Sequence, residues 1–210
     1  MDSIRAVVFD MDGTLIESTS CVVGAYQAVA DAAGRPVPSE AAVIDAYRLG
    51  PPRVILAHLL GRPATAADES TYLDALRDRC HSVRVYDGIA DALADLAGCC
   101  RLAVFTGASA AAAQVLLQDV GLLSFFDVVV GGDEVARAKP HPDGINLALD
   151  RLGVTAPSAA YVGDSPADTG AAKAARTLAV SAGWGHLYDP STPGDLVASS
   201  PLNLVKLVCS

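Results

Sequence analysis

Short apolar runs recur along the chain, and each is followed by or ends at a small or acidic residue. The runs are four to five residues long, are rich in β-branched side chains, and show little alternation between apolar and polar positions. This pattern is typical of strands that are buried on both faces of a parallel sheet. The predicted strands are residues 6–10, 102–106, 126–130, 159–163 and 177–180.

Helical periodicity lies between several of these runs. Ile89, Leu93 and Leu96 fall at positions i, i+4 and i+7, and similar apolar stripes occur over residues 115–120 and 145–152. Gly153 stands where a helix stop is expected. Strands and helices alternate from residue 102 onward, so the sequence predicts an α/β fold with a doubly wound parallel sheet.

One long segment, residues 17–84, breaks this alternation. It contains no convincing strand and reads as four helices over residues 19–33, 39–49, 53–60 and 68–83. Glycine and proline separate the first three of them. Because the segment is far too long for an ordinary βα loop, we expect a small helical domain inserted after the first strand. The core domain would then comprise residues 1–16 and 85–210, and the insertion residues 17–84.

Composition and charge narrow the class of protein. Hydrophobic residues make up 51% of the 210 residues, which excludes global disorder. The net charge of −9 and the absence of a Lys/Arg run argue against nucleic-acid and anionic-membrane partners. No apolar stretch approaches the roughly 20 residues that span a bilayer, and the first residues do not form a signal peptide. We therefore expect a cytoplasmic protein, either a monomer or a homodimer.

The five cysteines show no metal-binding or disulfide signature. They are Cys21, Cys80, Cys99, Cys100 and Cys209. Their number is odd, two are adjacent, and no C-x-x-C pair occurs. The sequence therefore predicts buried or incidental free thiols in a reducing compartment, with the adjacent pair at a buried strand entry.

Polar residues follow the predicted strands, where ligands bind in open α/β sheets. The segments in question are Asp10-Met11-Asp12-Gly13-Thr14, Thr106-Gly107, Lys139-Pro140 and Gly163-Asp164-Ser165-Pro166-Ala167-Asp168. Taken singly, each has an ordinary explanation as a turn, a helix cap or a surface lysine. Taken together, they would bring several carboxylates to one edge of the sheet, where mutual repulsion requires a cation. Oxygen ligands without histidine or thiolate favour Mg²⁺.

These four segments resemble the four motifs of the haloacid dehalogenase superfamily, in its phosphatase branch. The likeness covers nearly the whole chain and is greatest to phosphoglycolate-phosphatase-like proteins. Residues 17–84 resemble the helical cap of the first type found in that superfamily. The resemblance implies a Rossmann-like core, Mg²⁺ as cofactor, and hydrolysis of a small phosphorylated metabolite.

The resemblance also implies a role for each motif residue. Asp10 would be the nucleophile that becomes an aspartyl-phosphate, and Asp12 the general acid and then the general base. The metal would be held by Asp10, the backbone carbonyl of Asp12 and Asp164. Thr106 and Gly107 would bind phosphoryl oxygens, Lys139 would neutralise nucleophile and phosphate, and Asp168 would orient Lys139 or metal-bound water.

Other activities of the superfamily remain as alternatives. Asp12 disfavours dehalogenation, and the absence of lysine from residues 17–84 argues against phosphonatase chemistry. A β-phosphoglucomutase-like mutase stays open, although Thr14 favours simple hydrolysis. Asp is common at the position of Glu17 among phosphoglycolate-phosphatase-like proteins. This difference weakens the inference that the chain shares their substrate. A catalytically silent phosphometabolite-binding module is disfavoured because Asp10 and Lys139 are both present.

The insertion also contains a candidate specificity loop. Arg48 and Arg53 flank Gly50-Pro51-Pro52, and we hypothesise that Arg53, with Arg48, reads an anionic or hydroxylated leaving group. His141 follows the lysine motif and is a candidate for the entrance of the site. Trp184 is expected to pack at the end of the fifth predicted strand.

Overall fold

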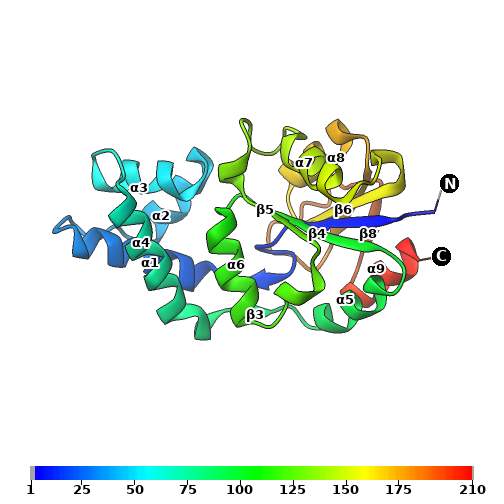
Figure 1. The fold of residues 1–210 in the computed structure, drawn as a ribbon, viewed down its shortest axis with the longest axis horizontal. Helices are drawn as coiled ribbons and strands as arrows, with labels where there is room; N and C mark the ends of the chain where they lie inside the picture. Colours follow the sequence, from blue (N-terminus) through cyan, green and yellow to red (C-terminus); the bar gives the residue numbers. More distant parts are fainter. Residues whose placement is uncertain (1–2, 210) are drawn as a thin grey trace.

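A six-stranded parallel sheet forms the centre of the molecule (Figure 1). The computed structural model describes residues 3–209, and the strands lie in the order β5-β4-β1-β6-β7-β8. Every neighbouring pair is parallel. The strands are β1 (Ala6–Phe9), β4 (Arg101–Phe105), β5 (Val128–Val130), β6 (Ala159–Gly163), β7 (Leu178–Ala182) and β8 (Leu196–Ala198). The predicted α/β fold with a parallel sheet is confirmed.

Helices cover both faces of this sheet. One face carries α5 (Ile89–Ala97), α6 (Ala110–Asp119) and α9 (Pro201–Val208), and the other carries α7 (Asp143–Leu152) and α8 (Pro166–Ala175). Along β1, Val7 and Phe9 belong to the first apolar cluster, whereas Ala6 and Val8 belong to the second. Burial on both faces explains why the predicted strands lack alternation.

The helical insertion lies beyond the carboxyl ends of the strands, at the left of Figure 1. It consists of α1 (Thr19–Ala32), α2 (Glu40–Ala46), α3 (Pro52–Leu60) and α4 (Ala66–Arg79). Short 3₁₀ turns at Tyr47–Leu49 and Cys80–Ser82 end two of the four predicted helices early. Helix α4 packs against α1 and α6. The division of the chain into two domains stays a prediction.

A two-stranded ribbon connects the insertion to the rest of the chain. Strand β2 (Ile16–Glu17) pairs antiparallel with β3 (Arg84–Val85), so the chain enters and leaves the insertion side by side. The side chain of Ile16 is fully buried. The sequence did not predict this ribbon, because a two-residue strand is too short for any periodicity to appear.

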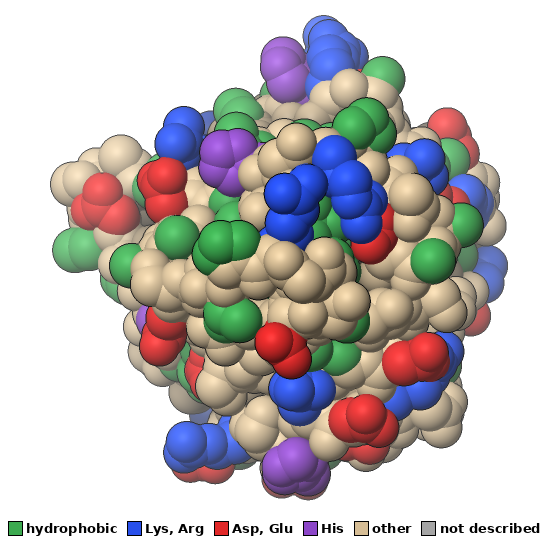
Figure 2. Space-filling model, turned by 90° about the vertical axis from the view of Figure 1, so that its left-hand side faces the viewer, with side chains coloured by type: hydrophobic (Ala, Val, Ile, Leu, Met, Phe, Trp, Pro, Cys, Tyr) green, Lys and Arg blue, Asp and Glu red, His purple; other side chains and the backbone are tan. Residues whose placement is uncertain are grey.

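Acidic and basic side chains are interspersed on the face that the insertion presents (Figure 2). This face therefore shows no continuous field of one sign. Within residues 3–209, the helices are all too short or too polar to pass through a bilayer. The cytoplasmic location and the oligomeric state, monomer or homodimer, stay predictions.

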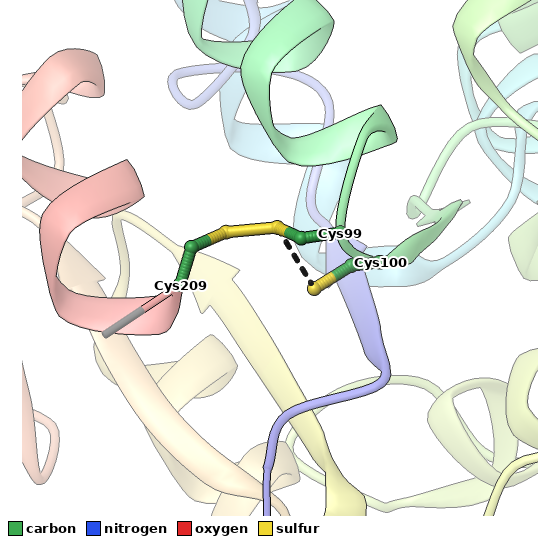
Figure 3. Close-up of side chains that lie close together, drawn as sticks. All are labelled: Cys99, Cys100 and Cys209. Atoms are coloured by element: carbon green, nitrogen blue, oxygen red, sulfur yellow. Dashed lines mark hydrogen bonds between the residues drawn. A yellow bond between two sulfur atoms is a disulfide. The ribbon is translucent and has the colours of Figure 1, made fainter.

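The prediction that all five cysteines are free thiols is wrong. Cys99 and Cys209 form a disulfide that joins the turn after α5 to the end of α9 (Figure 3). Cys100 is a buried free thiol whose Sγ lies 3.7 Å from that of Cys99. The sequence shows no such pair because 110 residues separate the bonded cysteines, and only the packing of α9 on α5 brings them together.

Candidate active site

A cavity of about 380 Å³ lies between the carboxyl edge of the sheet and the insertion. Its lining contains seven of the eight residues that the sequence predicted for the site. They are Asp10, Asp12, Thr106, Gly107, Lys139, Asp164 and Asp168. Residues from four separate stretches of the chain therefore converge on one space.

The topology of the sheet explains this convergence. Strands β4, β1 and β6 are neighbours, and Thr106, Asp10 and Asp164 each stand one residue after the end of their strand. Phe9 of β1 is in register with Val104 on one side and Val162 on the other, so the three strands end at nearly the same level. Parallel strands thus present all three polar side chains at the same edge.

Lys139 is the cation of the site, and its side chain is 15% exposed. Its Nζ donates to Asp10 Oδ1 at 2.6 Å and to Asp168 Oδ1 at 2.8 Å, and it lies 3.4 Å from the Tyr161 hydroxyl. The three protons of the ammonium therefore have three acceptors. Burial disfavours the charged form of Lys139, but Asp10 and Asp168 outweigh burial and hold its pKa well above the usual value.

Asp168 accepts a hydrogen bond from Lys139 through Oδ1. Its other oxygen, Oδ2, accepts from the backbone N–H and the hydroxyl of Ser165, in the capping box that begins α8. Burial would raise the pKa of Asp168, but Lys139 and Ser165 more than offset burial and lower it. Both oxygens are thus engaged, so the geometry suits a residue that orients the lysine.

Asp12 lies at the cavity beside Ser18, whose hydroxyl donates to Asp12 Oδ1. Burial raises the pKa of the Asp12 carboxyl above its ordinary value, although the Ser18 hydrogen bond and Lys139 oppose that effect. A raised pKa favours the protonated form, from which a carboxyl can give a proton to a leaving group. The geometry and the pKa therefore suit an acid–base residue.

Asp164 sits in a narrow space that two glycines leave open. A Cβ on Gly13, whose φ is +84°, would lie 2.3 Å from Asp164 Oδ2, and a Cβ on Gly185 would lie 2.1 Å from Asp164 Cβ. The backbone N–H of Leu187 donates to Asp164 Oδ2 at 2.9 Å. Any larger residue at these two positions would displace the carboxylate, which is only 3% exposed.

The donor set fits a hard divalent cation. Carboxylate oxygens of Asp10, Asp164 and Asp168 all lie within 4.8 Å of one another. Asp168 is occupied as described, whereas within residues 3–209 no donor contacts Asp10 Oδ2 or Asp164 Oδ1. Burial raises the pKa of both Asp10 and Asp164, and a neighbouring cation would favour their charged forms. Asp10 and Asp164 are thus suitable ligands for Mg²⁺, and the expected third ligand is the backbone carbonyl of Asp12.

Thr106 and Gly107 line the cavity between the end of β4 and the start of α6. The Thr106 hydroxyl oxygen accepts from the backbone N–H of Ala108 at 3.2 Å, which leaves its own proton free to donate. Thr106 is buried, and Ser109 caps the following helix. Hydroxyl and backbone N–H donors near a helix N-terminus suit the oxygens of a phosphoryl group.

The structure does not bring Arg53 to this cavity. Its guanidinium contacts Glu69 at 3.1 Å and its side chain is 66% exposed, so it lies on the outer surface of the insertion. Arg48 does line the cavity, but it forms a two-bonded ion pair with Asp45. His141 does not belong to the lining. Trp184 follows β7 as expected, and its Nε1–H donates to the Thr14 carbonyl.

The sequence did not indicate several residues that line the cavity. Three tyrosines of the insertion, Tyr26, Tyr47 and Tyr72, line the cavity, and so do Ser18 and His186. Tyr26 and Tyr72 occupy apolar helical positions, which normally indicate core packing. Composition is the feature of the sequence that could have indicated these tyrosines, since three of the six tyrosines fall within the insertion.

The chain matches a known protein family over most of its length. Residues 4–176 match the family model described as haloacid dehalogenase-like hydrolase. A phosphoglycolate phosphatase of Rhodospirillum rubrum is 36% identical over 199 residues, covering 89% of this chain and 82% of the relative. The probable phosphatase IndB of Dickeya dadantii is 34% identical over 192 residues, covering 87% and 83%.

Solved structures show the same architecture. CbbY of Rhodobacter sphaeroides, solved in complex with phosphate, superposes with a TM-score of 0.79 at 26% identity, over 96% of each chain. The likeness thus includes both the sheet and the insertion. The chain belongs to the haloacid dehalogenase-like hydrolase family.

Proposed function

We propose that this protein is a Mg²⁺-dependent phosphatase that hydrolyses a small phosphorylated metabolite through an aspartyl-phosphate on Asp10. The observation that carries the proposal is the buried Asp10–Lys139–Asp168 group, which faces the cavity beside Asp12. Phosphatases among the relatives support it, as does the phosphate bound to CbbY.

In the first step the Asp10 carboxylate attacks phosphorus, and the bond from phosphorus to the ester oxygen breaks. The leaving oxygen takes a proton from the Asp12 carboxyl and departs as an alcohol. Lys139 balances the charge of Asp10 and of the phosphoryl oxygens, while Thr106 and Gly107 donate to those oxygens. Asp168 keeps the ammonium in place throughout.

In the second step Asp12, now a carboxylate, removes a proton from water. The water oxygen attacks phosphorus, the bond to Asp10 breaks, and inorganic phosphate leaves. The Asp10 carboxylate and the protonated Asp12 are thereby restored. When bound to Asp10, Asp164 and the Asp12 carbonyl, Mg²⁺ would neutralise charge on the nucleophile and the phosphate.

The insertion closes the other side of the cavity, and in this proposal it acts as a cap that limits water and contacts the leaving group. A cavity of about 380 Å³ suits a small molecule. A mutase would use the same Asp10 chemistry, but it would return the phosphoryl group to a second hydroxyl of the sugar instead of to water.

The test is phosphate release from a panel of small phosphomonoesters, first with Mg²⁺ and then with a chelator. We expect release from one or a few compounds, its loss on chelation, and its recovery when Mg²⁺ is added back. Activity that persists with chelator would contradict the metal assignment. Isomerisation of a sugar phosphate without phosphate release would identify a mutase instead.

A further inference from the structure

The two ends of the cavity have opposite chemistry. Among residues 3–209, the core contributes every acidic residue of the lining and its lysine, together with His186 and several uncharged residues. The acidic residues and the lysine are Asp10, Asp12, Lys139, Asp164 and Asp168. The insertion contributes aromatic and aliphatic side chains, together with Ser18, Thr19 and a single charged residue. These apolar side chains are Val22, Tyr26, Tyr47, Pro51, Pro52, Ile55 and Tyr72. A phosphomonoester bound with its phosphate at the sheet edge would place its leaving group against this wall.

The wall offers little to an anionic leaving group. Arg48 is its only charged lining residue among residues 3–209, and its guanidinium is held by both oxygens of Asp45 at 3.1 and 2.9 Å. Arg53, the other candidate, lies outside the cavity and contacts Glu69. A carboxylate here would also face four aspartates across the cavity, and the one cation of the wall already shares its charge with Asp45.

The three tyrosines form one cluster. The ring centroids of Tyr26 and Tyr72 are 4.7 Å apart, and those of Tyr26 and Tyr47 are 6.5 Å apart, within the range of favourable aromatic pairs. Tyr26 and Tyr72 are 2% and 3% exposed, so they support the cluster from within. Tyr47 is 37% exposed and lines the cavity, so it is the ring best able to meet an incoming group.

The charge of the tyrosine phenols and the volume of the cavity also favour an uncharged leaving group. Burial raises the pKa of all three phenols, so these three side chains are uncharged at neutral pH. The cavity volume of about 380 Å³ is within the range of sites for drug-sized ligands, and it leaves room for more than the two carbons of glycolate.

We infer that the leaving group of the substrate is uncharged and apolar, with an aromatic ring as the best fit, and that it packs against Tyr47 on the Tyr26–Tyr72 pair. This inference rests on the proposed phosphatase function. It distinguishes the protein from the relatives named for phosphoglycolate, whose leaving group is a two-carbon carboxylate.

The experiment compares kcat/KM for phenethyl phosphate, ethyl phosphate and phosphoglycolate, using the full chain with Mg²⁺. All three are alkyl esters, so differences in leaving-group acidity are small. We expect phenethyl phosphate to exceed each of the others at least about tenfold, which is the effect of burying one phenyl group. Equal or higher kcat/KM for phosphoglycolate would overturn the inference and leave the phosphatase function intact.

Two variants test whether the preference for phenethyl phosphate depends on Tyr47. Tyr47→Ala should reduce the preference for phenethyl over ethyl phosphate by about two- to tenfold, because the ring contact is lost. Val54→Ala removes an exposed apolar side chain from α3 that does not line the cavity, and it should leave the preference unchanged. An unchanged preference in Tyr47→Ala would overturn the assignment of the wall.

A binding measurement separates this inference from the proposed function. Phosphonates in which CH₂ replaces the ester oxygen of phenethyl phosphate and of phosphoglycolate cannot be hydrolysed, and calorimetry gives their Kd directly. Tighter binding of the phenyl compound would support the wall even if no ester were hydrolysed, an outcome that would refute only the phosphatase. Equal or weaker binding would overturn the wall whether or not the esters are hydrolysed.

Discussion

The two ends of the cavity differ in how their side chains are held. At the sheet edge, Lys139 and Asp168 each have their hydrogen-bonding groups occupied, and Asp164 fits a space that only glycine at positions 13 and 185 leaves open. At the insertion, packing of tyrosine rings and aliphatic side chains holds the wall. The first end is specified by directional bonds between charges, and the second by shape. A site held by directional hydrogen bonds tolerates few substitutions. An apolar surface held by packing can accept other apolar residues of similar volume.

The most severe test of the charged end is Asp10→Asn. The amide keeps the shape of the side chain but is a poor nucleophile, so we expect kcat to fall on the order of 10⁴-fold or more. Phosphate release and thermal unfolding should be measured together, to show that the fold is retained. Asp95→Asn, at an exposed position on α5, is the matched control. Full activity of Asp10→Asn would refute the proposed mechanism.

Lys139→Met tests whether the directional bonds are needed for stability as well as for catalysis. The change leaves Asp10 and Asp168 buried without their cation, so we expect a loss of about 3–5 kcal/mol in the free energy of unfolding. The loss of transition-state stabilisation should lower kcat by about 10²–10³-fold. Urea denaturation and initial rates measure the two effects. Lys173→Met, at an exposed lysine on α8, should change neither.

Reduction of the Cys99–Cys209 disulfide tests a region far from both ends of the cavity. The bond closes a loop of 110 residues at the amino edge of β4, so reduction should lower the free energy of unfolding by up to about 4–5 kcal/mol. Because the cavity lies at the opposite edge of the sheet, kcat should not change. In Cys209→Ser the reductant should have no further effect on stability. A loss of activity on reduction would show that the two edges are coupled.

The smallest predicted effect lies within the insertion, at the capping box of α4. The Arg62 guanidinium and Thr65 hold the pKa of Asp68 well below its usual range. A depressed pKa adds stability above the unfolded pKa of about 3.9, and this stability is lost as pH falls through the folded pKa. Asp68→Asn should therefore cost about 1 kcal/mol at pH 7 and less in acid. Denaturation at several pH values measures this, with the exposed Asp74→Asn as control.

The sequence predicts most of the core and the charged end for one physical reason. Strands buried on both faces appear in the sequence as continuous apolar runs. The residue after each run therefore lies at the carboxyl edge of the sheet. Strand β8 was missed because its apolar run is only three residues long, between Asp195 and Ser199, and α9 was missed with it. The tyrosine wall was missed because Tyr26 and Tyr72 look like core residues along their helices. Arg53 was misplaced because helix α3 turns it towards Glu69.

The β2–β3 ribbon has a consequence for how such a protein can evolve. Both ends of the insertion leave the core at one place, so residues between the two short strands can be lengthened, shortened or exchanged without a shift in the register of the six-stranded sheet. The insertion, and with it the preferred substrate, can therefore change while the residues that carry out the reaction stay the same. A descendant could acquire a new wall while Asp10, Lys139 and Asp164 stay in the positions that their strands give them.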